Sequence, residues 1–309
     1  MKKVVVAEYL PDQHLALLHS RYDVLYDPDL YGDRDRLLDE LADAEAIFIR
    51  NRTRIDDELI GAARGLRVVG RLGVGLDNID MEGCDRAGVR VISAIGGNAV
   101  SVAEYVMGAM LVLARGVFGM SPSMVAGEWP RQGHAFGREL MGKTLGLIGL
   151  GSIAREVAKR AAAFGMQIVA HDPLLSEADP VWETVGRADL KTVLSEADVV
   201  TVHVPLNDGT RHLIDADALR AMKPTTILIN TSRGGTVDET ALATALRNGV
   251  IAGAALDVFA TEPLGPGPAS IFAGIPNLIL TPHVAGNTAE SVDRVAGTIV
   301  EAVIDMLES

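Results

Sequence analysis

The chain is short of cysteine and of positive charge, and each shortage excludes a class of protein. Cys84 is the only cysteine among the 309 residues, so no disulfide can form within the chain and a reducing compartment is expected. Lysine and arginine number 28 against 41 aspartates and glutamates, which gives a net charge of −13. Such a balance disfavours binding to nucleic acid.

Long apolar runs are also missing. No unbroken run reaches the roughly 18 residues that a membrane span requires. The apolar stretch that opens the chain is four residues long and ends at Glu8, which is too short for the core of a secretion signal. The sequence therefore predicts a cytoplasmic protein without a membrane partner.

Apolar runs alternate with helical patterns along the chain, as they do in parallel α/β sheets. The early runs lie at 4–7, 45–49, 66–70 and 89–92, and the helical patterns near 11–20, 33–43 and 56–63. A long apolar helix is expected at 99–118, a second β/α series spans 145–281, and a last helix is expected at 288–307. Asn287 is the expected N-cap of that last helix, with Glu290 as its capping partner. At this length two domains are expected.

A glycine-rich turn separates the apolar run at 144–150 from a helical stretch. Gly149 permits a tight strand-to-helix turn, and Gly151 lets the backbone approach a pyrophosphate. Ala154 allows close packing of the helix on the strand. The pyrophosphate would lie at the amino end of that helix, where free N–H groups favour anions. The turn therefore indicates dinucleotide binding.

Asp172 ends the next apolar run, about 20 residues after the glycine turn. A carboxylate at this place accepts hydrogen bonds from the adenosine ribose and repels a 2′-phosphate. Pro173 and Leu174 follow it, so no neighbouring arginine is offered to NADP, and NAD is the predicted cofactor. The alternative is that Asp172 is only a turn residue ahead of Pro173.

Three polar residues, Arg233, Glu262 and His283, each follow an apolar run that is typical of a strand. In a doubly wound sheet, loops at the carboxyl ends of the strands share one crevice, where ligands bind. A guanidinium in a glycine-rich loop suits bidentate binding of a carboxylate. Taken singly, each residue also has a structural interpretation: a solvated arginine, a turn residue before Pro263, or a structural histidine. Together with the dinucleotide turn, they indicate redox chemistry on an anionic carbonyl compound.

Five motifs, in order, resemble the D-isomer-specific 2-hydroxyacid dehydrogenases, and the resemblance covers essentially the whole chain. The motifs are GRLGVGLDN at 70–78, GLGSIA at 149–154 with Asp172, TSRGG at 231–235, DVF at 257–259 leading to Glu262-Pro263, and PHVAG at 282–286. The phosphoglycerate dehydrogenase branch is the most similar. Because the chain stops at Ser309, the carboxy-terminal regulatory domain of many enzymes of that branch is expected to be absent.

The resemblance implies a role for each matching residue. His283 would be the general acid that protonates the carbonyl oxygen during reduction, Glu262 would orient its imidazole, and Arg233 would bind the substrate carboxylate. The backbone N–H groups of Leu72, Gly73, Val74 and Gly75 would hold that carboxylate from the other domain. Residues at several strand ends would bind NAD: Gly149, Gly151, Ser152, Ile153, Asp172, Val204, Pro205, Thr210, Thr231, Ser232, Asp257 and Gly286. No metal site is predicted.

The glycine turn lies too far from the amino terminus for a lone Rossmann domain, so roughly the first hundred residues must form another unit. The resemblance implies that the last helix returns to this unit. The expected fold is α/β with two doubly wound parallel sheets. A Rossmann-type NAD-binding domain at 99–283 would be inserted into a flavodoxin-like substrate domain made of 1–98 and 284–309. Closure about hinges near 97–99 and 284–287 would carry His283 onto the substrate.

The identity of the substrate is the least determined part. Arg50 continues the strand at 45–49 and is expected to bind the substrate, as a partner for a second anion such as a phosphate or sulfonate. Arg52 and Arg54 either share this role or remain in water, and the stretch WPRQGH at 129–134 offers further cationic and aromatic groups. The candidates are 3-phosphoglycerate, 3-sulfolactate, or a simpler glyoxylate- or hydroxypyruvate-type acid. The alternative from another class is a non-catalytic, NAD-sensing scaffold.

The expected helix at 99–118 is apolar over a broad arc. The surface of one domain can cover only part of this arc. Monomers rarely expose large contiguous apolar patches, and two-fold symmetry is the commonest way to cover one. A homodimer built on this helix is therefore predicted, and Val106→Glu is expected to split it. The alternative is that the interface between the two domains covers the second face.

Overall fold

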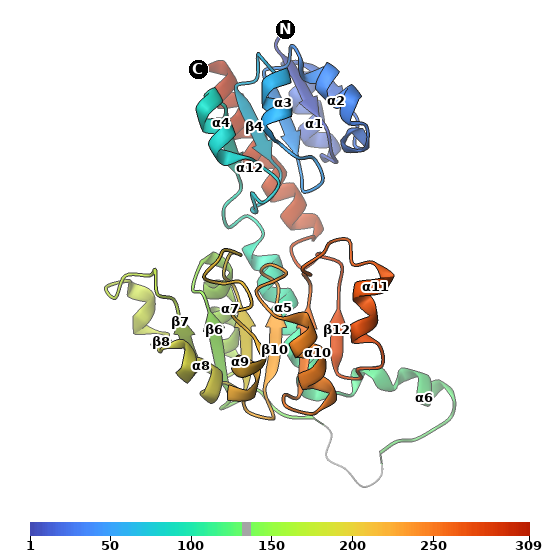
Figure 1. Cartoon of the computed structure of the whole chain (residues 1–309), viewed down its shortest axis with the longest axis vertical. Helices are drawn as coiled ribbons and strands as arrows, with labels where there is room; N and C mark the ends of the chain where they lie inside the picture. Colours follow the sequence, from blue (N-terminus) through green and yellow to red (C-terminus); the bar gives the residue numbers. More distant parts are fainter. Residues whose placement is uncertain (132–136) are drawn as a thin grey trace. The chain divides into compact units, whose positions relative to one another are not determined.

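The computed structural model describes residues 1–131 and 137–309. Backbone contacts divide the chain into two compact units (Figure 1): unit 1 consists of Met1–Asn98 and Asn287–Ser309, and unit 2 of Ala99–Gly286. The second boundary lies between 286 and 287, three residues after the predicted position between 283 and 284.

Unit 1 holds a five-stranded, wholly parallel sheet of order β2-β1-β3-β4-β5. This is the flavodoxin-like order. Its strands are β1 (Lys3–Val6), β2 (Asp23–Tyr26), β3 (Ala46–Ile49), β4 (Val68–Arg71) and β5 (Arg90–Ser93). Its helices are α1 (Asp12–His19), η1 (Leu30–Gly32), α2 (Arg34–Leu41), α3 (Asp57–Ala62), α4 (Met81–Ala87) and α12 (Ala289–Glu308).

Two apolar clusters cover the faces of the unit 1 sheet. Alternation along β1 sends Val4 and Val6 into one cluster and Val5 into the other, because successive strand residues point to opposite faces. Helix α12 completes the first cluster with seven buried side chains: Val295, Ala296, Ile299, Val300, Val303, Ile304 and Leu307. The last helix is therefore part of the core of unit 1.

Unit 2 holds a seven-stranded, wholly parallel sheet of order β12-β11-β10-β9-β6-β7-β8. Its strands are β6 (Thr144–Ile148), β7 (Gln167–His171), β8 (Gly186–Arg187), β9 (Val199–Val202), β10 (Ile227–Asn230), β11 (Gly253–Leu256) and β12 (Leu278–Leu280). The strand order reverses between β6 and β9, which is where a doubly wound sheet binds its ligand.

Helices cover both faces of the unit 2 sheet. The elements are α5 (Ala99–Arg115), η2 (Phe118–Met120), α6 (Ser121–Val125), α7 (Ser152–Ala163), η3 (Pro180–Glu183), α8 (Leu190–Glu196), α9 (Ala216–Ala221), α10 (Glu239–Arg247), α11 (Pro266–Ala269) and η4 (Ser270–Phe272). Helices α5 and α7 lie on one face of the sheet, and α8, α9 and α10 lie on the other (Figure 1). The buried side chains of the first pair share one apolar cluster, and those of the other three share a second. Strands β9, β10 and β11 are buried at every position, which explains their nearly continuous apolar sequences.

Two helix ends differ from the sequence-based prediction. Helix α5 ends at Arg115 rather than at residue 118, because Gly116 takes the left-handed conformation with φ +62°. The N-cap of α12 is Thr288 rather than Asn287, and its hydroxyl accepts the N–H of Ser291 at 3.1 Å. The Asn287 side chain instead accepts a hydrogen bond from Arg50.

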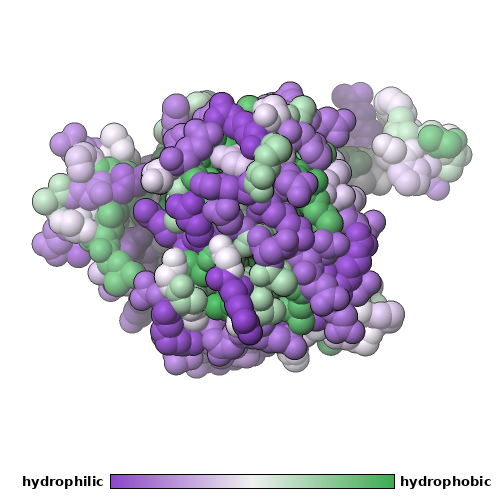
Figure 2. Space-filling view, turned by 90° about the horizontal axis from the view of Figure 1, so that it is seen from above, coloured by the Kyte–Doolittle hydropathy of each residue, from purple (hydrophilic) through white to green (hydrophobic). Residues whose placement is uncertain are grey.

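Among the described residues no single helix is long and apolar enough to cross a membrane. Two consecutive helices, Ala99–Arg115 and Phe118–Val125, are together long and apolar enough for a membrane span, by length and composition alone, but the chain bends by 68° between them. Hydrophilic side chains cover most of the face seen in Figure 2.

Candidate active site

The glycine turn follows β6, at the reversal of strand order in unit 2. Gly149 has φ +86°, and a Cβ there would lie 2.8 Å from the carbonyl oxygen of His203, so the turn requires glycine. Gly151 is the N-cap of α7, and a Cβ there would meet nothing within 4 Å. No described side chain caps α7, so the first N–H groups of the helix, at Ser152 and Ile153, remain for an anion.

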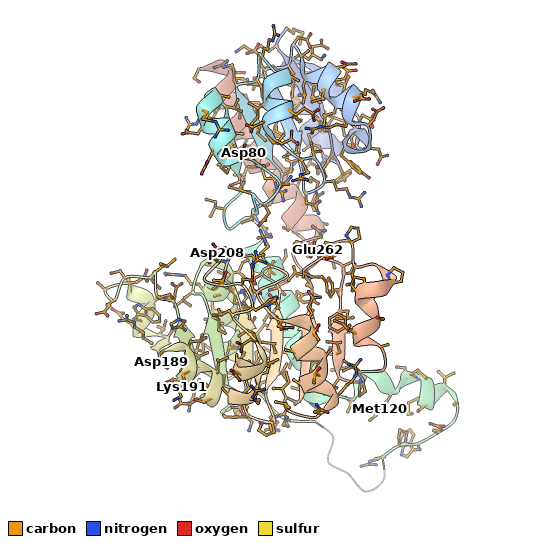
Figure 3. The ribbon with its side chains drawn as sticks, viewed as in Figure 1. Asp80, Met120, Asp189, Lys191, Asp208 and Glu262 are labelled. Carbon is orange, nitrogen blue, oxygen red and sulfur yellow. The ribbon has the colours of Figure 1, made fainter. Side chains whose placement is uncertain are left out.

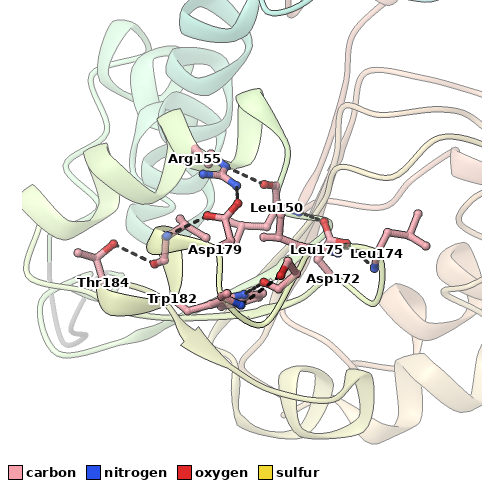
Figure 4. A network of polar contacts seen from close by, with 11 residues as sticks. Leu150, Arg155, Asp172, Leu174, Leu175, Asp179, Trp182 and Thr184 are labelled. Carbon is pink, nitrogen blue, oxygen red and sulfur yellow. Dashed lines mark hydrogen bonds and ion pairs between the residues drawn. The ribbon is translucent and has the colours of Figure 1, made fainter.

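Asp172 joins the end of β7 to the glycine turn (Figure 4). One carboxylate oxygen accepts the N–H of Leu150 at 2.8 Å, and the other accepts the N–H groups of Leu174 and Leu175 at 3.0 and 3.2 Å. Asp172 therefore does act as a turn residue, since it binds the N–H groups of the turn that follows it. The same contacts place its carboxylate beside the dinucleotide turn.

An ion pair that the sequence analysis missed supports the same turn. Arg155 donates to the carbonyl oxygen of Leu150 at 3.1 Å and to Asp179 at 2.9 Å (Figure 4). The Arg155 guanidinium and the N–H of Val181 hold the pKa of Asp179 below its usual range. The only sequence signal was an arginine in the first turn of α7 and an aspartate in front of Pro180.

The other predicted NAD-binding residues of unit 2 also follow strands. Val204 and Pro205 come after β9, and the hydroxyl of Thr210 donates to the carbonyl oxygen of Pro205 at 2.6 Å. Thr231 and Ser232 come after β10. The hydroxyl of Thr231 is buried and has no hydrogen-bond partner in the described part of the chain. A buried hydroxyl without a partner is unfavourable, so it fits a ligand that supplies one.

The Arg233 loop lies against the chain that leads to Glu262. A Cβ on Gly234 would lie 1.9 Å from the carbonyl carbon and oxygen of Phe259, so only glycine permits this approach. Arg233 donates from its guanidinium to the carbonyl oxygen of Ser232 at 2.6 Å. Its own carbonyl oxygen accepts the hydroxyl of Thr236 at 2.7 Å, which closes the loop.

His283 and Glu262 form a hydrogen-bonded pair. The Nδ1 atom of His283 donates to Oε2 of Glu262 at 2.7 Å, while Oε1 of Glu262 accepts the N–H of Phe259 at 2.9 Å. Burial acts to raise the pKa of Glu262. The hydrogen bonds from His283 and Phe259, with the charge of Arg233, outweigh burial and hold that pKa below its usual range. Glu262 lies at the same edge of unit 2 as Asp208, which follows β9 (Figure 3).

Asp257, predicted to bind the cofactor, holds the backbone around His283. Its buried carboxylate accepts the hydroxyl of Thr281 at 2.6 Å and the N–H groups of Val284 and Ala285 at 2.9 and 2.8 Å. His283 has φ +56°, a conformation that side chains rarely adopt and that needs support from its surroundings. Neither this positioning role nor the hydrogen bond from Tyr105 to Thr281 was predicted from the sequence. Gly286 ends the segment.

In unit 1, part of the predicted carboxylate-binding loop is already occupied. The N–H of Leu72 donates to the carbonyl oxygen of Ile49 at 2.8 Å, and that of Gly73 to the carbonyl oxygen of Arg71 at 2.7 Å. Within residues 1–131 and 137–309 the N–H groups of Val74 and Gly75 have no acceptor. Only the last two of the four predicted N–H groups are therefore available to a ligand.

The arginines after β3 differ in their surroundings. Arg50 donates to the side-chain oxygen of Asn287 at 3.4 Å. Arg52 lies over the ring of Tyr31, 4.9 Å from its centroid, and donates to its hydroxyl. Arg54 is exposed. Of the stretch at 129–134, the residues from 132 onward lie outside the described part of the chain.

Among the described residues, no group of three or more histidine, cysteine, aspartate or glutamate side chains could hold a metal ion. Arg233, Glu262 and His283 follow the adjacent strands β10, β11 and β12 of unit 2. An imidazole hydrogen-bonded to a carboxylate can give and take a proton, and a guanidinium can bind a carboxylate.

Comparison with known proteins identifies the class. The family model described as "D-isomer specific 2-hydroxyacid dehydrogenase, NAD binding domain" matches residues 107–285. The chain is 49% identical over 304 residues to (S)-sulfolactate dehydrogenase of Chromohalobacter salexigens, with 98% of this chain and 97% of that protein covered. It is 39% identical over 305 residues to D-3-phosphoglycerate dehydrogenase of Archaeoglobus fulgidus, with 98% and 57% covered.

A solved structure shows the same fold. The crystal structure of the TT0316 protein from Thermus thermophilus matches with a TM-score of 0.89 at 35% identity, covering 99% of this chain and 97% of that one. The chain belongs to the D-isomer-specific 2-hydroxyacid dehydrogenases. It is an NAD-dependent enzyme that interconverts a 2-hydroxy acid and its 2-oxo acid by hydride transfer. The predicted family, fold class, reaction and cofactor are confirmed.

Proposed function

We propose that the substrate carries a second anionic group, of the 3-sulfolactate or 3-phosphoglycerate type. The observation that carries this proposal is Arg50, whose guanidinium contacts only a neutral amide oxygen, at 3.4 Å, and has no carboxylate partner among the described residues. A cation left without a carboxylate suits an anionic ligand. The higher identity to a sulfolactate dehydrogenase than to a phosphoglycerate dehydrogenase favours the sulfonate.

In the proposed reduction, His283 donates a proton to the carbonyl oxygen of the 2-oxo acid. Glu262 fixes the tautomer of the imidazole and stabilises its protonated form. Arg233 binds the substrate carboxylate and polarises the carbonyl. Within unit 1, the N–H groups of Val74 and Gly75 are available to an anion. Bound NADH supplies the hydride, and the remaining contribution of the chain is position and charge.

The substrate is tested by NADH oxidation with 3-sulfopyruvate, 3-phosphohydroxypyruvate, hydroxypyruvate and glyoxylate. We expect kcat/KM to be at least about tenfold higher for the acids with a second anion, since one well-placed charged contact is worth that much. The highest value is expected for 3-sulfopyruvate. A preference for hydroxypyruvate or glyoxylate would instead establish the simpler type of reductase.

Asp172→Ala is expected to raise the KM for NADH about tenfold, the loss for one charged hydrogen bond, and to improve the use of NADPH relative to NADH. The variant loses the ribose acceptor and the repulsion of a 2′-phosphate. It also frees the N–H of Leu150, which weakens binding of both cofactors, so the ratio is the informative quantity. Asp179→Ala is the control, because it loosens the same network without changing the ratio. An unaltered ratio in Asp172→Ala would leave Asp172 as a turn residue only.

Glu262→Gln is expected to shift the alkaline limb of the pH profile for reduction to lower pH. The variant lacks the negative charge that stabilises the protonated imidazole. In the wild type the pKa of Glu262 is depressed, so its carboxylate is charged at and above the ordinary glutamate value of about 4.3. Its contribution is therefore present across the neutral range and is lost only in stronger acid. Steady-state kcat/KM between about pH 5 and pH 10 measures the shift, and an unmoved limb contradicts the role.

A homodimer is also part of the proposal, but on a different surface from the one first predicted. Val106 is fully buried inside unit 2 with Met107 and Met110, so Val106→Glu would damage the core rather than an interface. Exposed apolar side chains gather just after α5, where Phe118 is 63% and Val125 90% exposed. This segment leads through η2 and α6, where Met120 is labelled in Figure 3. Exposed apolar surface of this kind is typical of a protein interface.

Val125→Glu is expected to convert the protein from a dimer to a monomer. A charge placed on a buried apolar contact is strongly unfavourable. Sedimentation at micromolar concentration should then give a mass near the 32.7 kDa of one chain, whereas the wild type should give twice that mass. Leu174→Glu is the control, because Leu174 is equally exposed but lies after β7. A monomeric wild type would exclude the dimer.

A cytoplasmic location without membrane or nucleic-acid partners completes the proposal. It is supported by the single cysteine, Cys84, which is buried and unpaired, and by the net charge of −13.

A further inference from the structure

Glu8 is a buried carboxylate that the reaction described above does not use. It lies two residues after β1 and is 4% exposed. Its Oε1 atom accepts the main-chain N–H groups of Arg50 at 2.7 Å and Thr53 at 3.0 Å, and both of its oxygens lie 3.3 Å from the N–H of Arg52. No lysine or arginine side chain of the described residues pairs with it. Glu8 therefore binds the backbone of the loop at 50–53, here called the arginine loop.

Asn78 holds the same loop from its carbonyl side. Its amide nitrogen donates to the carbonyl oxygen of Arg50 at 3.0 Å and to that of Thr53 at 2.6 Å. The two side chains thus bind the N–H groups and the carbonyl groups of one short loop. Thr53 is buried, whereas the guanidinium of Arg50 extends from this fixed backbone to Asn287.

Glu8 follows β1, and the place of β1 in the sheet shows why the hydrogen bonds from the arginine loop to Glu8 matter. Strand β1 lies between β2 and β3, so the strand order of unit 1 reverses there. Loops after the strands on either side of such a reversal form the ligand crevice of a doubly wound sheet. The loop after β1 carries Glu8, and the loop after β3 is the arginine loop. An external anion could have bound these N–H groups, but the carboxylate of Glu8 already does so. An anionic ligand at this place must then be bound by side chains. Of the two arginines in the arginine loop, Arg52 lies over the ring of Tyr31, whereas the guanidinium of Arg50 contacts only an amide oxygen.

We propose that Glu8 is a positioning residue which, with Asn78, fixes the arginine loop so that Arg50 selects substrates with a second anionic group. This inference rests on the proposed function and adds the residues that determine its specificity. Buried carboxylates that accept several N–H groups hold a loop in one conformation, and a displacement of about 1 Å in a positioning group can lower a rate by as much as 10²-fold.

A simple electrostatic role for Glu8 predicts the opposite result. A negative charge beneath Arg50 repels an anionic substrate, so removing it would strengthen binding of that substrate. If Glu8 positions the loop, removing its charge weakens binding of the same substrate. The direction of the change in KM therefore separates the two roles.

Glu8→Gln is the decisive variant. The glutamine keeps one oxygen acceptor but places an amide NH₂ against the N–H of Arg52. We expect the KM for 3-sulfopyruvate to rise about tenfold, as for the loss of one charged contact, while kcat changes less than about twofold. The KM for glyoxylate, which has no second anion, should change little. Glu301→Gln, an exposed residue of α12 in the same unit, is the control for the loss of one charge.

Two further variants keep the test decisive. Asn78→Ala loosens the arginine loop from its other side, so it should give the same selective rise in KM even if Glu8→Gln fails to fold. In an Arg50→Ala background, Glu8→Gln should add nothing to the KM for 3-sulfopyruvate, because residues that act through one contact are not additive.

The outcomes are distinguishable. A selective rise in the KM for 3-sulfopyruvate that disappears in the Arg50→Ala background supports the inference. An unchanged or lower KM overturns it, as does an equal loss with both acids, which would make Glu8 a support of the fold alone. A wild-type enzyme with no preference for a second anion overturns the proposed substrate class and this inference with it.

Discussion

His283→Ala should lower kcat by about 10²- to 10⁴-fold, the usual loss when a positioned acid or base is removed. The dissociation constant of NADH should stay within about twofold, because the imidazole acts on the substrate oxygen and not on the cofactor. Rapid-mixing measurement of hydride transfer together with fluorescence titration of NADH separates the two quantities.

The control for this variant is His19→Ala, which removes an exposed histidine at the end of α1. It should leave both quantities unchanged. Near-normal turnover in His283→Ala would remove this residue from the mechanism. Equal loss of turnover and NADH affinity would show instead that the backbone held by Asp257 has collapsed.

Arg233→Ala should lower kcat/KM by about 10²- to 10³-fold, the range expected when one partner of a close charge pair is removed. Arg233→Lys should recover only a small part of the loss, because an ammonium cannot bind a carboxylate through two parallel hydrogen bonds. Steady-state kinetics with 3-sulfopyruvate and with glyoxylate should show the same loss, since both acids carry the carboxylate that Arg233 is proposed to bind.

Arg64→Ala, an exposed position of unit 1, is the control for the loss of one positive charge. A loss confined to 3-sulfopyruvate would contradict the assignment, because it would place Arg233 at the second anion and not at the carboxylate.

The glycine turn and the strand ends were predictable from the sequence for a physical reason, whereas the pairing of His283 with Glu262 was expected from the family resemblance. Gly149 needs a left-handed backbone close to His203, and its place between an apolar run and a helical pattern is visible in the sequence. Strands β9, β10 and β11 are buried on both faces, so their apolar runs stand out. Glu262 follows the buried strand β11, and His283 follows the partly buried edge strand β12 beside it, so the strand order brings the two side chains together.

The missed features depend on partners far away in the sequence. Strand β2 was not predicted, because its apolar run, Val24-Leu25-Tyr26, is only three residues long and lies between two aspartates. The N–H groups of Leu72 and Gly73 are occupied by carbonyl oxygens that no motif reveals. No motif reveals the partners of Asp257 either. Its carboxylate accepts hydrogen bonds from Thr281, Val284 and Ala285, which lie more than 20 residues later in the sequence. Val106 looked available for an interface because its helix is apolar all round, but its own unit covers it.

The contribution of α12 to unit 1 sets the order in which the two units can form during synthesis. Proteins emerge from the ribosome at about 5–20 residues per second, and domains generally fold from the amino terminus onward. The first cluster of unit 1 needs seven side chains between Val295 and Leu307, whereas all of unit 2 has been made once Gly286 is added. Until α12 is made, the face of the unit 1 sheet that carries Val4, Val6 and Phe48 lacks the α12 part of its cover, while unit 2 can already fold. During that interval the nascent chain exposes an apolar surface that chaperones would bind.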